Sequence, residues 1–268
     1  MKTHKRVLTI AGSDSGGGAG IQADLKTFSA LGCFGMSAIT AITAQNTTAV
    51  TAIYPIPADV VGKQIAAVIS DIGVDAVKIG MLNSPEVIGE VAAQLKQFQV
   101  KKIVLDPVMV AKSGDKLLQD ESIEALKREL IPLAEIITPN IPEAEVLTAR
   151  AISNKEEMIE AAKQLIENGA KSVLLKGGHF EGETSPDCLM LNNREVIWFE
   201  SKRVASPNTH GTGCTLSSAI ASYLALGKST LEAVKLAKQF ITNAIIAGAD
   251  YKIGNGHGPV HHFHLLWK

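Results

Sequence analysis

Short apolar, β-branched runs alternate with helix-like segments along most of the chain, and this alternation limits the possible fold more than any other feature. Runs at 7–12, 36–44, 76–80, 102–107, 136–140 and 172–178 predict strands, and helical patterns fill most of the intervals. Strands that alternate with helices form parallel sheets through right-handed crossovers. We therefore predict one α/β domain over residues 1–268, with a mainly parallel central sheet, helices on both faces and a hairpin within 187–200.

The charge balance and the few cysteines exclude several classes of function. The chain carries 26 basic and 27 acidic residues, for a net charge of -1, which gives no electrostatic footprint for nucleic acid or an anionic membrane. Its three cysteines, Cys33, Cys188 and Cys214, are too widely spaced for a disulfide framework or a zinc site. No segment has the pattern of a signal peptide or of a membrane span. We expect a cytoplasmic protein that acts on a small molecule.

A glycine-rich loop at 12–20 joins the first predicted strand to a helix from about 21 to 31. This arrangement places a ligand at the carboxyl edge of a parallel sheet. The spacing does not match the dinucleotide fingerprint, because Ile21 stands where the last glycine would fall, and no Gly–Lys–Ser/Thr follows as in a P-loop. Asp24 lies one turn into the helix, where it either faces the ligand or favours the helix N-terminus electrostatically.

A second glycine segment, at 209–215, precedes a helix of small and apolar residues. Consecutive backbone N–H groups at such a helix start, here from Gly211 to Cys214, favour an anion together with the helix dipole. Cys214 falls in the first turn, where the pKa of a thiol is lowered, so we expect a base or nucleophile beside an anion cradle. The alternative is an ordinary glycine turn that enters a buried helix.

Polar residues that follow the other predicted strands should gather at the same sheet edge. Gln45, Asp106 and Lys176 each come at the end of a strand, and Asn140 and Glu143 lie three residues apart at a helix start. Each side chain also has an ordinary alternative. Gln45 is then a turn residue, Asp106 has a capping or turn role, Glu143 is a plain acid at a helix N-terminus, and Lys176 reaches solvent.

Four histidines lie between residues 257 and 264, and imidazole is a common metal ligand. No acidic or cysteine partner is interleaved with them. We therefore favour a loop that covers the sheet edge over a metal site.

Several of these segments together resemble one protein family. They are 11–24, 78–82, 106–109, 138–140 with Glu143, and 210–214, joined by the 256–262 tail. In this combination they resemble the hydroxymethylpyrimidine/phosphomethylpyrimidine kinases of thiamine biosynthesis, which belong to the ribokinase-like superfamily. The resemblance covers essentially the whole chain. It implies the ribokinase-like fold and a kinase that uses ATP and Mg²⁺ to phosphorylate 4-amino-5-hydroxymethyl-2-methylpyrimidine and then its monophosphate.

The resemblance also implies roles for individual residues. Catalysis would fall to Cys214 as the base, with Gly211 and Gly213 at the transferring phosphoryl group. Gln45 would hydrogen-bond the aminopyrimidine edge, and the rest of that pocket would be Gly12, Asp24, Met81 and Val108. Nucleotide contacts would come from Asn140, Lys176, Thr212 and Lys238, and metal ligands from Asp106 and Glu143. The relatives further suggest a homodimer.

Cys214 stands where most sugar kinases of this superfamily carry an aspartate, and it resembles the pyrimidine kinases and the related pyridoxal kinases in this. A thiolate there can take the proton of the hydroxymethyl group, whereas the second transfer needs no base because the phosphate oxygen is already anionic. A pyridoxal kinase of vitamin B6 salvage is the main alternative, since pyridoxal is a similar ring alcohol. A non-catalytic sensor of the pyrimidine or nucleotide is a further one, against which the intact transfer residues argue.

Overall fold

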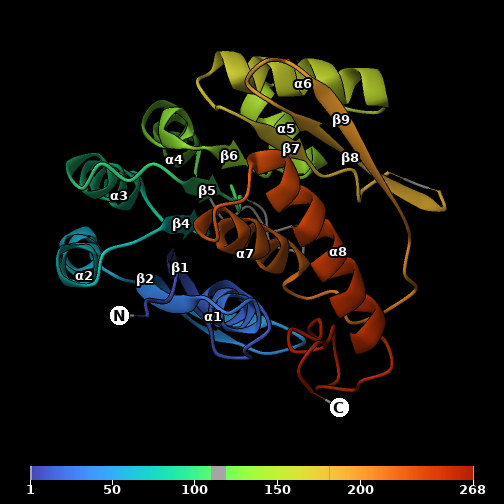
Figure 1. Ribbon diagram of the computed structural model, residues 1–268, viewed down its shortest axis with the longest axis horizontal. Coiled ribbons are helices and arrows are strands. Elements are labelled where there is room, and N and C mark those ends of the chain that lie inside the picture. Colours follow the sequence, from blue (N-terminus) through green and yellow to red (C-terminus); the bar gives the residue numbers. More distant parts are fainter. Residues whose placement is uncertain (1, 110–118, 181, 268) are drawn as a thin grey trace.

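One sheet runs through the middle of the molecule, and most of its strands point the same way (Figure 1). The structure, a computed structural model, describes residues 2–109, 119–180 and 182–267. Within these residues the sheet has nine strands in the order β3-β2-β1-β4-β5-β6-β7-β8-β9. The strands are β1 Arg6–Asp14, β2 Phe34–Gln45, β3 Val50–Pro55, β4 Ala76–Ile79, β5 Ile103–Leu105, β6 Ile136–Ile137, β7 Val173–Leu175, β8 Thr184–Met190 and β9 Val196–Lys202. The six from β2 to β7 in this order are parallel, and β3, β8 and β9 at the two edges are antiparallel.

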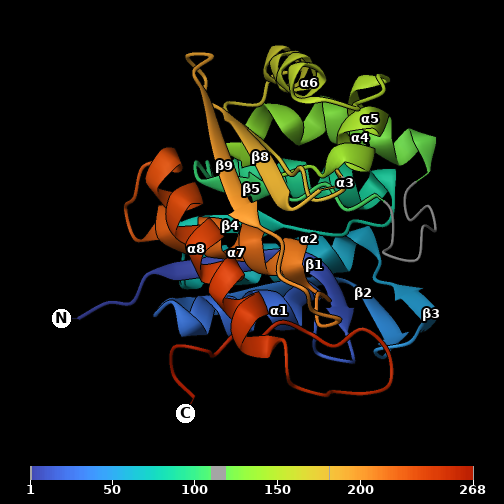
Figure 2. The same ribbon diagram turned by 90° about the vertical axis from the view of Figure 1, so that its right-hand side faces the viewer.

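Helices cover both faces of the sheet, as predicted (Figures 1 and 2). One face packs against α2 Ala58–Asp71, α3 Pro85–Gln97, α4 Asp120–Glu129, α5 Ile141–Thr148 and α6 Lys155–Glu167. The other face packs against α1 Gly20–Ala30, α7 Thr212–Ala225 and α8 Thr230–Gly248. The predicted strands and the hairpin, formed by β8 and β9, are confirmed. Two elements, α4 and the short 3₁₀ helix Ile131–Leu133, were not predicted from the sequence.

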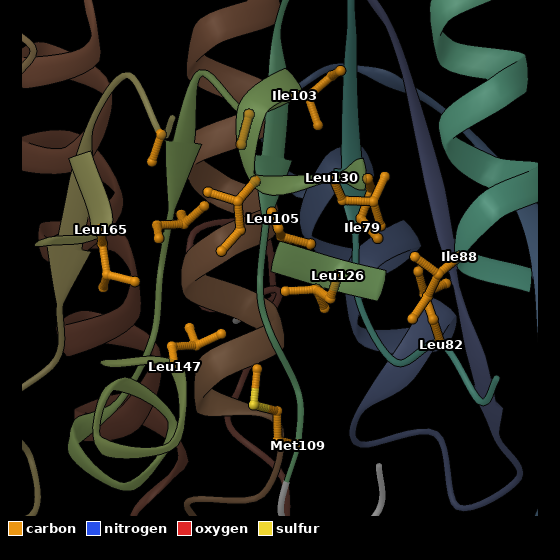
Figure 3. Close-up of a cluster of buried hydrophobic side chains, with 14 of the residues drawn as sticks. Ile79, Leu82, Ile88, Ile103, Leu105, Met109, Leu126, Leu130, Leu147 and Leu165 are labelled. Atoms are coloured by element: carbon orange, nitrogen blue, oxygen red, sulfur yellow. The ribbon is translucent and has the colours of Figure 1, made fainter. Parts of the chain in front are cut away.

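Each face of the sheet has its own apolar core, because successive strand residues point to opposite sides. In β1, Leu8 and Ile10 join the core beneath α2–α6, whereas Val7 joins the core beneath α1, α7 and α8. Figure 3 shows part of the first core, in which Leu126 of α4 and Leu130 directly after it face strand residues such as Leu105. The two cores hold the parallel strands between two helical layers, so that their carboxyl ends form one fixed edge.

The carboxyl edge of the sheet is shaped by an irregularity in β1. The register between β1 and β2 shifts between Ala11 and Ser13, which places Gly12 at a bulge. Bulges re-aim the chain next to binding sites, and here the glycine-rich loop begins directly after it. Among the helices of the described residues, none is long and apolar enough to cross a membrane.

Candidate active site

Backbone atoms of the two glycine segments, 12–20 and 209–215, are in close contact at the carboxyl edge of the sheet. Gly20, the first residue of α1, has a φ of +54°, and a Cβ there would lie 2.3 Å from the carbonyl oxygen of Gly12. Gly211, the N-cap of α7, has a φ of +77°, and a Cβ there would lie 1.8 Å from the carbonyl oxygen of Gly18. Only glycine fits such a contact in the left-handed region. The starts of α1 and α7 are therefore pressed against each other.

Cys214 occupies the junction of these two helix starts. It is the third residue of α7 and half-buried, and the backbone N–H of Gly20 donates a hydrogen bond to its sulfur. The predicted lowering of its pKa is wrong. Burial raises the pKa of the thiol to about 11, since the charge of Lys78 opposes this only in part while Asp24 and Asp106 add to it. The helix start and the Gly20 N–H do not outweigh the loss of water around the sulfur.

Asp24 is enclosed beneath Cys214 in a buried ion pair. Lys78 Nζ lies 2.9 Å from Asp24 Oδ2, and neither side chain has exposed surface. Thr9 Oγ1 and Ser218 Oγ each donate to the same carboxylate at 2.6 Å. Ser218 lies one turn beyond Cys214 on α7, so the network ties α1, the sheet and α7 together. A direct contact between Asp24 and a substrate would require some of these bonds to break, and the enclosure favours a role as counter-ion to Lys78.

Asp106 and Lys176 form a second ion pair, which borders the glycine segment of α7. Lys176 Nζ lies 3.1 Å from Asp106 Oδ1, and the carboxylate also accepts hydrogen bonds from Thr138 and Ser217. Burial alone would raise the pKa of Asp106, but the lysine charges and these bonds hold it below its usual range. A Cβ on Gly213 would lie 3.6 Å from Lys176 Nζ and 3.7 Å from Asp106 Oδ2. The predicted strand-end residues Asp106 and Lys176 therefore meet at the start of α7.

Asn140 and Glu143 form a reciprocal cap at the start of α5. The Asn140 side chain accepts from the Glu143 N–H at 2.9 Å, and Glu143 Oε2 accepts from the Asn140 N–H at 2.8 Å. The predicted placement on one side of the first turn is confirmed. Glu143 is nevertheless not a plain surface acid. Burial raises its pKa to about 7, and the negative charge of Asp106 adds to this while Lys176 opposes it.

Among the residues predicted for the pyrimidine pocket, Gly12, Gln45 and Met81 lie at the ends of β1, β2 and β4. Gly12 and Met81 touch, since a Cβ on Gly12 would lie 2.6 Å from Met81 Cε. Gln45 ends β2, where its backbone and the Ser15 hydroxyl exchange hydrogen bonds of 2.7 and 2.8 Å. Val108 is half-buried two residues beyond Asp106. Which of them touches a substrate stays a prediction.

Asp14 and His210 are site residues that the sequence analysis missed. His210 Nε2 lies 2.9 Å from Asp14 Oδ2, and the same ring nitrogen lies 3.4 Å from Gln45 Nε2. Asp14 and His210 are 196 residues apart, and no pattern in the sequence pairs them. Their positions were the available signal: Asp14 lies in the glycine-rich loop after the first predicted strand, and His210 lies within the second glycine segment.

Two further predicted nucleotide contacts, Lys238 and Thr212, have side chains that bind partners within the protein. Lys238 of α8 pairs with Asp187 of β8 at 2.7 Å, and the other oxygen of Asp187 accepts from the Gly177 N–H. Thr212 begins α7 and donates to the Thr209 carbonyl at 2.7 Å. Their nucleotide contacts stay predictions.

The histidine-rich tail runs past the turn between β2 and β3 (Figure 2). The His257 N–H donates to the Thr47 carbonyl, and Pro259 lies in a short bridge with His210. His262 Nε2 lies 3.1 Å from Thr215 Oγ1. Within the described part of the chain, no three histidine, cysteine or acidic residues form a metal-binding group. The tail thus covers the sheet edge beside the glycine segments.

The site is suited to phosphoryl transfer. That reaction asks little covalent chemistry of a protein, and it depends on N–H donors, positive charge and carboxylates held around the phosphoryl oxygens. Fold and site together define a kinase of the α/β class. A family profile described as phosphomethylpyrimidine kinase matches residues 14–261, and the chain belongs to that family.

Relatives named hydroxymethylpyrimidine/phosphomethylpyrimidine kinase match this chain over nearly their full lengths. The chain is 52% identical to the hydroxymethylpyrimidine/phosphomethylpyrimidine kinase of Rhizobium meliloti, over 97% of this chain and 98% of the relative. The protein of that name from Escherichia coli is 46% identical, over 97% and 98%. A crystal structure of phosphomethylpyrimidine kinase from Clostridium difficile, 53% identical, covers 90% of this chain and 99% of its own with a TM-score of 0.80.

Pyridoxal kinases have the same fold at lower identity. An ADP complex of the Bacillus subtilis pyridoxal kinase is 40% identical, over 98% of this chain and 99% of its own, with a TM-score of 0.91. The predicted ribokinase-like fold and the resemblance to the pyrimidine kinases are confirmed, and the chain is a phosphotransferase.

Proposed function

We propose that the protein transfers the γ-phosphoryl group of ATP to the hydroxymethyl group of 4-amino-5-hydroxymethyl-2-methylpyrimidine, and then a second phosphoryl group to the monophosphate. The proposal is carried by the surroundings of Gly213. Cys214 follows it in the chain, and a Cβ on Gly213 would point toward both Lys176 and Asp106. N–H donors, a cation, a carboxylate and a thiol converge there. Relatives bearing the names of both activities support the choice of substrate.

The backbone N–H groups from Gly211 to Cys214 and the Lys176 ammonium would hold the transferring group. N–H groups at a helix start, already fixed before the ligand arrives, stabilise the charge that spreads over the phosphoryl oxygens. The left-handed backbone of Gly211 sets the direction of these groups, because it turns the chain into α7. Lys176 adds a point charge beside Gly213.

The acidic residues fit a magnesium ion. Mg²⁺ takes oxygen ligands and is commonly bound through one or two carboxylates together with substrate phosphates. Asp106 and Glu143 lie close enough for the charge of one to raise the pKa of the other, which is the situation that a divalent cation relieves. A magnesium ion bound there with ATP would neutralise the phosphate charges.

In the first transfer, Cys214 would accept the proton of the substrate hydroxymethyl group. With a pKa of about 11, the thiol holds its proton at neutral pH, and Lys78 and the Gly20 N–H favour the thiolate as pH rises. We therefore expect the first transfer to accelerate above neutral pH. The second transfer starts from an anionic phosphate oxygen and needs no base, so it should not share that dependence.

The test is an ATP-dependent assay, with products resolved by mass, of the aminopyrimidine alcohol and pyridoxal side by side. A pyrimidine diphosphate is the expected product. Cys214→Ala should slow the first transfer by about 10²–10⁴-fold, the range for a lost general base, and leave the second within a few-fold. Cys214→Ser is the matched control of similar size. Equal loss of both steps in Cys214→Ala would contradict the assignment of the base.

Vitamin B6 salvage is the second candidate, and the structural likeness to the Bacillus subtilis pyridoxal kinase favours it. Phosphorylation of pyridoxal with the pyrimidine untouched would move the protein there. Lack of substrate-dependent ATP turnover with either compound would instead indicate a sensor. Homodimer formation, a cytoplasmic setting and the remaining nucleotide contacts stay predictions, the first of which a molar-mass measurement in solution would test.

A further inference from the structure

Asn208 carries a buried side-chain amide and lies shortly before Gly211, where the second glycine segment enters α7. Its Nδ2 donates to the carbonyl oxygens of Gly248 at 2.7 Å and Tyr251 at 2.6 Å, and it lies 3.3 Å from the carbonyl oxygen of Ala249. Three acceptors around one atom determine the direction of the amide, because only its nitrogen end carries hydrogen. Both hydrogens of this amide are therefore committed to the chain at the end of α8.

These bonds cap the C-terminus of α8 from a distant part of the chain. The last carbonyl groups of a helix have no partner within it, and Gly248 is the last residue of α8, with Ala249 as its cap. Asn208 supplies donors from 40 residues away, where a helix commonly ends on a nearby glycine instead. A buried amide that lost these acceptors would keep unpaired hydrogens, which is costly. The end of α8 thus fixes the place of Asn208.

The C-terminal tail confines the other end of the same amide. A Cβ on Gly258 would lie 2.1 Å from Asn208 Oδ1, so the backbone of the tail packs directly on the amide oxygen. The Gly258 carbonyl accepts from the His210 N–H at 3.0 Å, and the Val260 N–H donates to the His210 carbonyl at 3.4 Å. The chain is therefore held at residue 208 through its side chain and at residue 210 through its backbone.

This held stretch leads directly into the N–H groups at the start of α7. The Thr209 carbonyl, which lies between the two anchored residues, accepts from the Thr212 hydroxyl at 2.7 Å. Gly211 then turns the chain with a φ of +77°. Because peptide units are planar, the direction of each N–H follows from the backbone that precedes it. A shift at Asn208 would consequently turn the N–H groups from Gly211 to Cys214.

We propose that Asn208 is a positioning residue for phosphoryl transfer, which fixes the entry of residues 209–214 against the end of α8 and so directs their N–H groups. This rests on the proposed function, in which these N–H groups hold the transferring phosphoryl group. Donors that are fixed in advance act mainly on charge that develops in the transition state, so their misdirection should lower kcat more than it raises KM. Both transfers use the same N–H groups, whereas only the first uses Cys214 as a base. Asn208 should therefore affect the two transfers alike.

The test is Asn208→Ala, which removes the amide without adding bulk. The kcat and KM values of each transfer are measured separately, starting from the aminopyrimidine alcohol and from its monophosphate. We expect kcat to fall about 10–100-fold in both, less than for a deleted oxyanion donor, because the N–H groups are turned and not removed. KM for either pyrimidine should change only a few-fold.

Asn154→Ala is the matched control, because Asn154 also caps a helix with its side chain. It accepts from the Glu157 N–H at 2.8 Å at the start of α6, which covers the other face of the sheet. Its loss should lower stability in urea without changing kcat of either transfer. Both variants are assayed under conditions where urea unfolding shows them to be folded, so that lost activity does not reflect unfolded protein.

Each outcome decides the proposal. Unchanged kcat values in Asn208→Ala, or a change confined to KM, would show a purely structural role and overturn it. Loss of the first transfer alone would place the effect on Cys214 instead of the N–H groups and would also overturn it. If Asn208→Ala does not fold, Gly258→Ala pushes on Asn208 Oδ1 from the tail and should lower kcat of both transfers by a smaller factor; unchanged values there overturn the proposal as well. A wild-type enzyme that phosphorylates neither pyrimidine would instead refute the proposed function itself.

Discussion

Two lysine–aspartate pairs lie at the carboxyl edge, and both influence the charge of Cys214. Lys78 and Asp24 are 2.9 Å apart with 0% of either side chain exposed. Lys176 and Asp106 are 3.1 Å apart, with 16% of the lysine exposed. The residue types and distances are nearly the same. The enclosure of the two pairs is different.

The difference determines what each pair can do. Each Asp24 oxygen has two donors, one from Lys78 and one from the hydroxyl of Thr9 or Ser218. A pair so satisfied and enclosed has nothing left for a ligand, and it contributes to the arrangement of the sheet and helices. The Lys176 ammonium instead borders Gly213 and keeps part of its surface open. An ion pair thus becomes a ligand-binding group only where it is left incompletely covered.

The largest expected effect comes from breaking the enclosed pair. Lys78→Met should lower the free energy of unfolding by about 3–5 kcal/mol, because it leaves Asp24 as a buried charge without its counter-ion. Urea unfolding followed by circular dichroism measures this. The double variant Lys78→Met/Asp24→Leu removes both charges and should recover most of the stability. If Lys78→Met were as stable as the wild type, the enclosure of this pair would contribute nothing to the free energy of unfolding.

The contrast between the pairs also shows what the sequence could predict. The alternation of strands and helices predicted the parallel sheet, and parallel strands bring their carboxyl ends to one edge by geometry. Asp106 and Lys176, 70 residues apart, could therefore be placed together before the structure was known.

The sequence could not predict which charged groups would be enclosed. Lys78 appears in the sequence as one residue of a strand, and its partner Asp24 is 54 residues away on a helix. Burial depends on what packs from the other side, here Ser218 of α7, and no local pattern encodes that. The pKa of Cys214 was mispredicted for the same reason. A helix start favours a thiolate, but only the packed structure shows how little water reaches the sulfur.

The second prediction concerns the incompletely covered pair. Lys176→Met should lower kcat/KM by about 100-fold, the effect of removing one group that stabilises the transferring charge, equivalent to about 2.7 kcal/mol. Its loss of stability should be well under that of Lys78→Met, because Thr138 and Ser217 still donate to Asp106. Steady-state kinetics and urea unfolding of the same samples separate the two effects. The exposed Lys235 provides a control, since Lys235→Met should change neither.

The smallest expected effect extends the comparison to the tail, where His262 is buried beside Thr215, the residue after Cys214. Burial, with added repulsion from Lys26 and the neighbouring histidines, lowers the pKa of His262 from 6.5 to about 3. The unfolded chain therefore binds a proton between these values that the folded chain does not, and stability must fall as pH drops below 6.5. The buried His262 should lower the free energy of unfolding by about 2 kcal/mol at pH 5, 1.5 pH units below its unfolded pKa.

His262→Gln keeps a side-chain N–H or oxygen near Thr215 and cannot take up the proton. Unfolding in urea at pH 7, 6 and 5 should show a shallower decline in that variant, and parallel declines would mean that water reaches His262 and that the enclosed region ends before the tail.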